Sequence, residues 1–379
     1  MTASPAPDFI HADGRRIVDG SGAPALRRGV GIGNWLLPEG YMWHFGHGHG
    51  SPREIEALIE ELVGADRARD FWLRFRRDFF NADDVAELAA LGFDHIRLPI
   101  NSRVVMDDDG ELLPGGFALI DGCLDWCEAA GVRVILDLHG APGGQTGTNI
   151  DDSPRKLPEL FLHEHYQALT ERLWVELARR YRDREVVGAF DLLNEPLPNH
   201  WQWEFADALA ETYRRLTRAI REVDPHHLLM YEGSHWANNW SLFTAVWDDN
   251  SALQFHKYWS PPTRESIAGY LDKRDELGLP IFMGESGENT PEWIRAAFRL
   301  YEAEDIGWNF WPWKKIDTTT SPRSVTPPPG WAEILAYSTG EGPRPAADEA
   351  WKTLEQLLAN MRVDACERVR LVELALFGE

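Results

Sequence analysis

The sequence predicts an α/β fold, a single (β/α)8 TIM barrel over residues 1–379 with a helical insertion after the first strand, at residues 36–82. Short apolar runs alternate along the chain with amphipathic helical patterns. The runs are apolar enough to be buried on both faces, and eight of them alternating with helices are typical of a parallel barrel. An open doubly wound sheet is the alternative, but no G-x-G-x-x-G turn follows a strand here.

The predicted barrel elements follow one another in chain order. The strands are expected at residues 29–35, 94–100, 132–139, 186–195, 228–232, 253–259, 280–285 and 308–313. The helices are expected at residues 84–91, 119–130, 163–182, 204–223, 267–277, 291–304 and 350–361. Gly92, Gly131 and Gly278 follow three of these helices, where glycine commonly ends a helix. A chain of 379 residues can hold two or three domains, but α/β barrels reach this size as one.

The insertion between the first two strands carries extra helices. Ser51-Pro52-Arg53-Glu54 is a capping box with proline at the first helical position, and it opens a helix over residues 55–63. An aromatic-rich second helix is expected at residues 65–79. Loops that follow barrel strands project over the active-site face. We therefore expect residues 36–82 to wall the substrate cleft.

Charge and cysteine content exclude several classes of protein. A formal net charge of −23 argues against a nucleic-acid partner, which requires basic patches. Cys123 and Cys127 are four apart in one predicted helix, so they are expected to be buried neighbours in the core. No signal peptide is visible, and no stretch is apolar and long enough to cross a membrane. We expect no membrane partner and a cytoplasmic location, unless a leader has been removed.

Tryptophan is unusually abundant, with 17 residues. Indole rings present a flat apolar face and a polar edge, which suits sugar rings. About half of them are expected to serve packing alone. The others favour a carbohydrate ligand.

Polar residues end nearly all of the predicted strands, where barrel enzymes hold their catalytic groups. These residues are Asn34, Arg97, His139, Asn194, Glu195, Glu232, His256, Tyr258, Glu285 and Trp311. Glu195 and Glu285 lie on strands four and seven, which face one another across a barrel mouth. Two carboxylates about 5 Å apart cleave a glycosidic bond with retention, and a wider gap gives inversion. Glu232 is expected either to support this site or contact the substrate, or to serve the fold alone.

The motifs around these residues resemble glycoside hydrolase family 5, a group of (β/α)8 cellulases, exo-glucanases and relatives, over nearly the whole chain. Asn194-Glu195-Pro196 is similar to the family's acid/base motif, and Gly284-Glu285 to its nucleophile motif. The resemblance implies a retaining β-glycoside hydrolase without metal or cofactor, with Glu195 as acid/base and Glu285 as nucleophile. Its implied substrate-binding residues are Asn34, Arg97, His139, Asn194, His256, Tyr258 and Trp311, with Trp313 as the alternative to Trp311.

The segments 34–36, 137–147 and 307–314 are most similar to the exo-β-1,3-glucanase branch. They favour exo-action on β-glucosides or short β-1,3-glucan oligosaccharides. Ser286-Gly287-Glu288 follows the nucleophile where that branch commonly has an aromatic residue, so the identity of the substrate stays open. An endo-β-1,4-glucanase, a diglycosidase and a glycolipid glycosidase are alternatives of the same fold.

Two alternatives belong to other classes. A non-catalytic carbohydrate-binding barrel would not need the intact carboxylate pair. A metal-dependent barrel hydrolase would need His-x-His at the end of strand one, where Gly33-Asn34-Trp35 stands. His44, His47 and His49 form a glycine-spaced loop, for which a flexible surface is favoured over metal binding.

Overall fold

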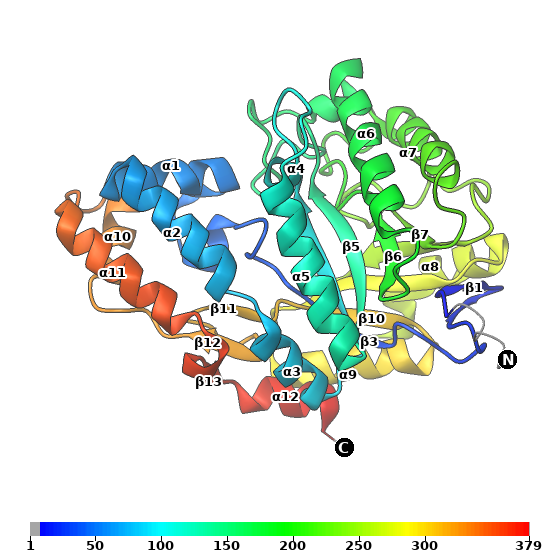
Figure 1. Ribbon diagram of the computed structural model, residues 1–379. Coiled ribbons are helices and arrows are strands. Elements are labelled where there is room, and N and C mark those ends of the chain that lie inside the picture. The colour runs from blue at the N-terminus through cyan, green and yellow to red at the C-terminus, as the bar shows by residue number, and fades with distance from the viewer. Residues whose placement is uncertain (1–7, 379) are drawn as a thin grey trace, which may run out of the picture.

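The computed structural model describes residues 8–378, and its centre is a closed barrel of eight parallel strands (Figure 1). Around the barrel the order is β10-β3-β4-β5-β6-β7-β8-β9, so the last strand pairs with the first. The strands are β3 Arg28–Gly31, β4 His95–Asn101, β5 Arg133–Gly140, β6 Val187–Asp191, β7 Leu228–Glu232, β8 Ser251–His256, β9 Ile281–Gly287 and β10 Gly307–Trp311. The predicted (β/α)8 barrel is confirmed.

Helices cover the outside of the barrel and connect its strands. They are α3 Ala82–Leu91, the short α4 Ser102–Val105, α5 Pro114–Ala130, α6 Glu164–Tyr181, α7 Ala206–Arg221, α8 Arg264–Leu277 and α9 Pro291–Ala303. Gly131 and Gly278 adopt left-handed conformations, with φ of 69° and 68°, directly after α5 and α8. Residues 233–250, between β7 and β8, form turns and loops without a helix. Within the described part of the chain, no helix has both the length and the hydropathy to cross a bilayer.

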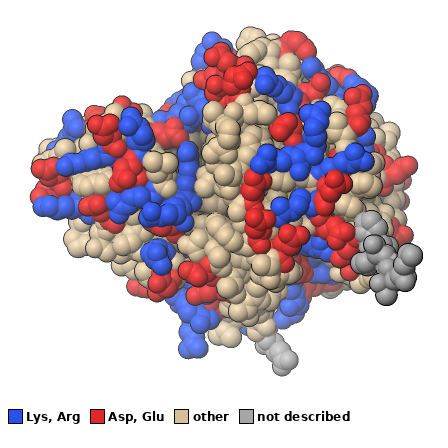
Figure 2. All heavy atoms as spheres, viewed as in Figure 1, with Lys and Arg blue, Asp and Glu red and all other residues tan. Residues whose placement is uncertain are grey.

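A lobe lies beside the barrel, at the left of Figure 1. Its helices are α1 Pro52–Val63, α2 Ala65–Asp78, α10 Trp331–Ser338 and α11 Ala347–Asn360. α2 packs against α11, and Arg74 Nη1 lies 3.0 Å from Glu355 Oε1. Glu54 accepts a hydrogen bond from the Ser51 N–H at 3.1 Å, as a capping box requires. Acidic and basic side chains are interspersed over the visible face of the lobe (Figure 2).

Smaller elements join the lobe to the barrel and close the ends of the described chain. The short strands are β1 His11–Asp13, β2 Arg16–Val18, β11 Lys314–Ile316, β12 Arg323–Val325 and β13 Glu367–Arg368. The 3-10 helices are η1 Gly40–Trp43, η2 His47–His49, η3 Glu159–Phe161 and η4 Val363–Ala365. The last helix, α12 Arg370–Phe377, packs against α9.

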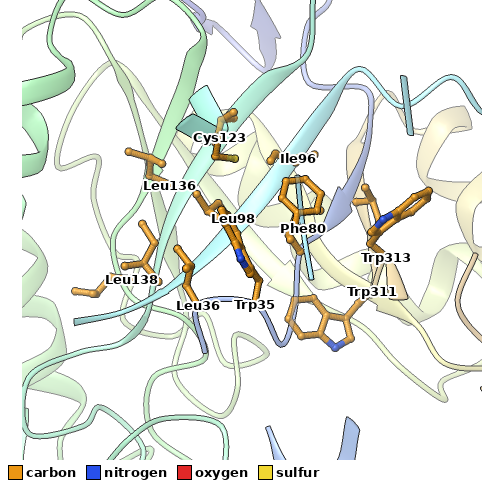
Figure 3. Packing of buried hydrophobic residues seen from close by; sticks show 14 of the residues in the cluster. Trp35, Leu36, Phe80, Ile96, Leu98, Cys123, Leu136, Leu138, Trp311 and Trp313 are labelled. Carbon is orange, nitrogen blue, oxygen red and sulfur yellow. The ribbon is translucent and has the colours of Figure 1, made fainter. Parts of the chain in front are cut away.

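Buried aromatic and aliphatic side chains fill the space between the strands and the helices. Figure 3 shows this packing for residues from several elements, among them Trp35, Phe80, Leu98 and Cys123. Cys123 and Cys127 are fully buried in α5 and unbridged, as expected from their spacing. Trp35, Trp43, Trp174, Trp308 and Trp313 are among the largest fully buried side chains. Each such side chain contributes about 1.5–3 kcal/mol of burial energy, so these indoles serve the core.

Candidate active site

A cavity of about 560 Å³ opens at the carboxyl ends of the barrel strands. Its volume falls within the range of roughly 300–1,000 Å³ that is typical of small-molecule sites. The residues around it come mainly from loops that follow barrel strands, and they are Glu39, Tyr41, His139, Thr148, Asn149, Ile150, Glu195, Trp236, Asn238, His256, Lys257, Tyr258, Trp259, Glu285, Glu288 and Trp311.

Glu195 and Glu285 face one another in this cavity. Glu285 lies within β9, and Glu195 follows β6 with a left-handed backbone, φ 43°. One oxygen of each carboxylate and a ring nitrogen of His256 all lie within 4.8 Å of one another. Carboxyl groups about 5–5.5 Å apart characterise retaining glycosidases, whereas inverting enzymes need roughly 6.5–9.5 Å to admit a water. The geometry therefore matches the retaining reaction.

A cation and a hydroxyl group contact Glu285, the predicted nucleophile. Arg97 Nη1 donates to Glu285 Oε1 at 2.5 Å, and the Tyr258 hydroxyl donates to Oε2 at 3.1 Å. Burial raises the pKa of Glu285, while the charges of His256 and Arg97 oppose that rise. These contacts stabilise the ionised carboxylate that must attack the anomeric carbon. Both were predicted from the sequence as substrate-binding residues, and in the structure both contact the Glu285 carboxylate.

His256 contacts Glu195, the predicted acid/base. His256 Nδ1 lies 2.7 Å from Glu195 Oε1, and its Nε2 lies 3.2 Å from Glu232 Oε1. Burial by itself lowers the pKa of His256, but the carboxylates of Glu232 and Glu285, with hydrogen bonds to Glu195 and Glu232, raise it well above its ordinary value. The ring is therefore an imidazolium that bridges two glutamates.

Four carboxylates surround the Arg97 guanidinium below the cavity. Its nitrogens lie 2.5 Å from Glu285, 2.8 Å from Asp191, 3.0 Å from Glu232 and 3.1 Å from Asp137. Burial raises the pKa of Asp137 to about 8 and that of Asp191 well above its ordinary value. Burial also acts to raise the pKa of Glu232, but His256 and Arg97 lower it to about 2. Glu232 is thus ionised at neutral pH.

His139 and Trp311 form part of the cavity wall. Their rings are stacked, with centroids 5.6 Å apart and planes within 5°. Burial lowers the pKa of His139 to about 4, so the ring is neutral at neutral pH. His139 Nδ1 lies 2.7 Å from Asp137 Oδ2, and Asn194 Nδ2 lies 3.2 Å from Nε2. These contacts assign the proton to Nδ1 and leave Nε2 as an acceptor.

Two predicted substrate contacts have other roles in the structure. The prediction for Asn34 is wrong, because its side chain does not line the cavity: its Oδ1 accepts from Trp43 Nε1 at 2.6 Å and from the Glu39 N–H at 3.3 Å. Asn194 is likewise buried beneath the wall, where its Oδ1 accepts from Arg97 Nη2 at 2.9 Å. Asn34 shapes the loop that carries Glu39, and Asn194 orients Arg97 and His139.

Arg97 and Trp313 also lie away from the cavity surface. Arg97 is fully buried, so it acts on substrate through Glu285 and does not touch sugar directly. Trp313 is buried and donates its Nε1–H to Asp84 Oδ1 at 2.8 Å. Of the two candidate tryptophans it is therefore Trp311 that lines the cavity.

One side of the cavity contains residues that we did not predict. Glu39 and Tyr41, which come from the insertion, stand beside Glu288. Lys315 Nζ lies 2.7 Å from Glu288 Oε1 and 4.6 Å from the centre of the Tyr41 ring. Burial, followed by the charges of Glu285 and Glu195, raises the pKa of Glu39 well above its ordinary value, so that Glu39 can donate as well as accept.

Of residues 36–82, it is this short stretch that lines the cavity, whereas α1 and α2 belong to the lobe. The expected wall is thus limited to the residues just after β3. Glu39 follows the Asn34-Trp35-Leu36 motif by three residues, but nothing in its spacing marks it as facing a ligand.

Another part of the cavity lining comes from the loops after β7 and β8. Trp236, Asn238 and Trp259 line the cavity there, and Trp259 is 74% exposed. The abundance of tryptophan indicated aromatic surfaces for sugar, but it could not assign them to these positions.

The histidine loop shows no metal site among the described side chains. His44 Nε2 lies 2.8 Å from the backbone oxygen of Ile316, and the His47 side chain lies outside the described part. The described group with metal-ligand geometry is Glu195, His256 and Glu285. Those side chains are already hydrogen-bonded for acid/base and nucleophilic chemistry.

A closed parallel barrel with two facing carboxylates at its carboxyl end defines a retaining O-glycosyl hydrolase. Residues 66–317 match the family model described as cellulase, glycosyl hydrolase family 5. The chain belongs to this family.

Curated relatives carry several activities in their names. A β-xylosidase of Phanerodontia chrysosporium is 28% identical over 81% of this chain and 71% of its own length. A probable glucan 1,3-β-glucosidase A of Aspergillus clavatus is 30% identical over 61% of this chain and 55% of its own length. Endoglucanase C of Acetivibrio thermocellus is 31% identical over 63% of this chain and 85% of its own length.

Solved structures share the fold at lower identity. Rutinosidase from Aspergillus niger gives a TM-score of 0.62 at 18% identity, over 78% of this chain and 92% of that one. An endogalactoceramidase gives a TM-score of 0.62 at 19% identity, over 92% of this chain and 84% of that one. These likenesses concern the fold alone.

The predicted roles of the two carboxylates give a complete reaction. Glu195, as the acid, would protonate the glycosidic oxygen as Glu285, as the nucleophile, attacks the anomeric carbon, which would form a glycosyl ester on Glu285 and release the leaving group. Glu195, then a carboxylate, would take a proton from water as that water attacks the anomeric carbon and frees Glu285. Two inversions at one carbon give net retention.

Proposed function

We propose that this enzyme is exo-acting and removes the terminal sugar from β-glucosides or short β-1,3-glucan oligosaccharides. The observation that carries the proposal is a wall of polar and aromatic side chains beside the two carboxylates. Glu39, Tyr41 and Glu288 come from β3 and β9, which flank β10 in the barrel. Trp311 Nε1 donates to the Tyr41 hydroxyl at 2.7 Å, which ties β10 to the same wall.

This wall supports a pocket for one terminal sugar. It is held by contacts between segments that follow neighbouring strands, among them the Glu288–Lys315 pair. Both side chains of that pair are mostly buried, 16% and 13% exposed, which makes it stronger than a surface ion pair. An endo-acting enzyme needs a cleft open on both sides of the catalytic carboxylates.

The tryptophan side supports the leaving-group position. Trp236 and Trp259 also line the cavity, and the exposed Trp259 ring is available to stack on a sugar or another flat group. We assign the leaving group, a second sugar or a non-sugar group, to these rings.

The names of several relatives also support exo-action, since glucan 1,3-β-glucosidases and a β-xylosidase are among them. They leave the identity of the terminal sugar to experiment. Endo-β-1,4-glucanase action, diglycoside cleavage and glycolipid cleavage are the other outcomes that the experiment must distinguish.

The test is a panel of aryl β-glucosides, β-xylosides and β-galactosides with β-1,3- and β-1,4-linked oligosaccharides. We expect glucose as the first product from β-1,3 oligosaccharides, released as the β-anomer in time-resolved NMR. Disaccharides or longer fragments as first products would overturn exo-action. Glu285→Gln, prepared in parallel, is the control that assigns the activity to this site.

A further inference from the structure

We propose that Glu232 is a positioning residue for the acid/base: its carboxylate holds the Glu195 backbone in its left-handed conformation and holds His256 against the Glu195 carboxylate. Glu232 ends β7, is fully buried and does not line the cavity. It therefore cannot touch substrate. The proposal depends on the retaining reaction and is independent of exo or endo mode.

The first contact is with the backbone of the acid/base. Glu232 Oε2 accepts a hydrogen bond from the Glu195 N–H at 2.7 Å. Glu195 has φ 43° and Leu197 has φ 60°, conformations that residues with a Cβ adopt rarely. A backbone of this kind persists where its surroundings hold it. The hydrogen bond to Glu232 is charge-assisted, and it fixes the backbone of Glu195, the residue whose carboxyl group must be oriented toward the glycosidic oxygen.

The second contact is with the imidazole ring that Glu195 touches. Glu232 Oε1 lies 3.2 Å from His256 Nε2, while Nδ1 of the same ring reaches Glu195. The Glu232 carboxylate therefore acts on Glu195 in two ways. One oxygen binds the Glu195 backbone, and the other binds the His256 ring that contacts the Glu195 side chain. The same oxygen, Oε1, also accepts from Gln254 Nε2 and from Arg97 Nη2.

Charged groups face the His256 ring from several strands. They are Glu232 of β7, Glu195 after β6 and Glu285 of β9, with Arg97 of β4 joined to Glu232 and Glu285. Without the negative charge of Glu232, Nε2 of the ring faces no carboxylate, and the imidazolium loses one of its three negative neighbours. Because His256 donates a hydrogen bond to Glu195, losing the Glu232 charge must alter the Glu195 carboxylate as well.

Glu232 makes no direct contact with the nucleophile. Arg97, the cation beside Glu285, keeps its contacts with Asp137 and Asp191, and Tyr258 still donates to Glu285. The expected defect is therefore larger in proton delivery than in nucleophilic attack. Proton delivery matters for poor leaving groups and hardly at all for leaving groups that depart as stable anions.

The test measures kcat/KM of Glu232→Gln over aryl β-glycosides of increasing leaving-group pKa, with a glycone that the enzyme accepts. We expect kcat/KM for dinitrophenyl glycosides to stay within about threefold of wild type, and kcat/KM for phenyl glycosides to fall by about 10²-fold. Glu195→Ala should show the same pattern, more strongly. The basic side of the pH profile should also change for Glu232→Gln with phenyl substrates.

Asp191→Asn is the matched control. It makes the same carboxylate-to-amide change on another fully buried partner of Arg97 and Gln254, but its carboxylate has no hydrogen bond to Glu195 or His256 among the described contacts. Any loss of kcat/KM in the Asp191→Asn enzyme should be equal for all leaving groups. A merely structural role for Glu232 would give the same flat pattern.

A folded Glu232→Gln enzyme with wild-type rates, or with an equal loss for all leaving groups, would overturn the proposal. If Glu232→Gln does not fold, Glu232→Asp retains the charge and withdraws the oxygens by one methylene, and a smaller leaving-group-dependent loss is expected. Nitrogen NMR of the wild-type histidines gives a further check, since a neutral His256 ring at neutral pH would also overturn it.

Discussion

Replacing Tyr258 with phenylalanine removes one hydroxyl from the nucleophile and leaves the ring. That hydroxyl donates to Glu285 Oε2 at 3.1 Å. Burial raises the pKa of Tyr258 well above its ordinary value, so the group stays protonated and remains a donor over the working range of pH. Since the hydrogen bond stabilises the ionised form of Glu285, its loss must raise the pKa of Glu285.

The size of the shift follows from the geometry. A hydrogen bond to a charged group contributes about 1.5–3 kcal/mol, and a separation of 3.1 Å places this one at the lower end. One pKa unit corresponds to about 1.4 kcal/mol, so the pKa of Glu285 should rise by about one unit. Activity requires ionised Glu285 and is lost as the pH falls through that pKa. The acidic limb of kcat/KM should therefore move to higher pH by about one unit.

The assay is the pH profile of kcat/KM with a dinitrophenyl glycoside, whose cleavage depends little on protonation by Glu195. Tyr41→Phe is the control, because the Tyr41 hydroxyl lies against Trp311 Nε1 and the ring beneath Lys315. The acidic limb of the kcat/KM profile of Tyr41→Phe should coincide with that of the wild-type enzyme. An unmoved limb in Tyr258→Phe would refute the assignment of Tyr258 as a donor to the nucleophile.

Two further changes test the site directly. Glu285→Gln should abolish turnover and leave sugar binding intact in calorimetric titration, because an amide keeps the shape and lacks the nucleophilic charge; wild-type rates would contradict its assignment. Trp311→Ala should raise KM and lower kcat together, by about tenfold each, because loss of the wall that packs on His139 misplaces the sugar. Steady-state kinetics with unchanged values would exclude Trp311 as a wall for the sugar.

The positions of the two carboxylates that face one another in the cavity could be predicted because strand ends are easy to locate in this chain. The run at residues 228–232 has the same bounds as β7, and the other runs differ from the observed strands by a few residues. Carboxyl ends of parallel strands converge, so a polar residue that ends an apolar run must lie near the others. Glu195 and Glu285 were found in this way, as was Tyr258 just beyond β8.

The loop residues could not be predicted, because their direction depends on contacts between distant segments. Asn34 and Glu39 lie in one loop. The Asn34 side chain accepts a hydrogen bond from Trp43, whereas Glu39 faces the cavity. Glu288 is held by Lys315, 27 residues away. Such pairings leave no periodic pattern in the sequence.

The lobe has a consequence for the order in which the molecule is completed. Its helices come from two segments far apart in the chain, and the pair Arg74 and Glu355 spans 281 residues. During synthesis α1 and α2 emerge early but must wait for α11 before their apolar faces are covered, because α11 is made after all eight barrel strands. Glu39 and Tyr41 lie on the segment that leads into α1. A chain that stops before α11 would therefore carry both carboxylates beside a lobe whose first two helices are left uncovered.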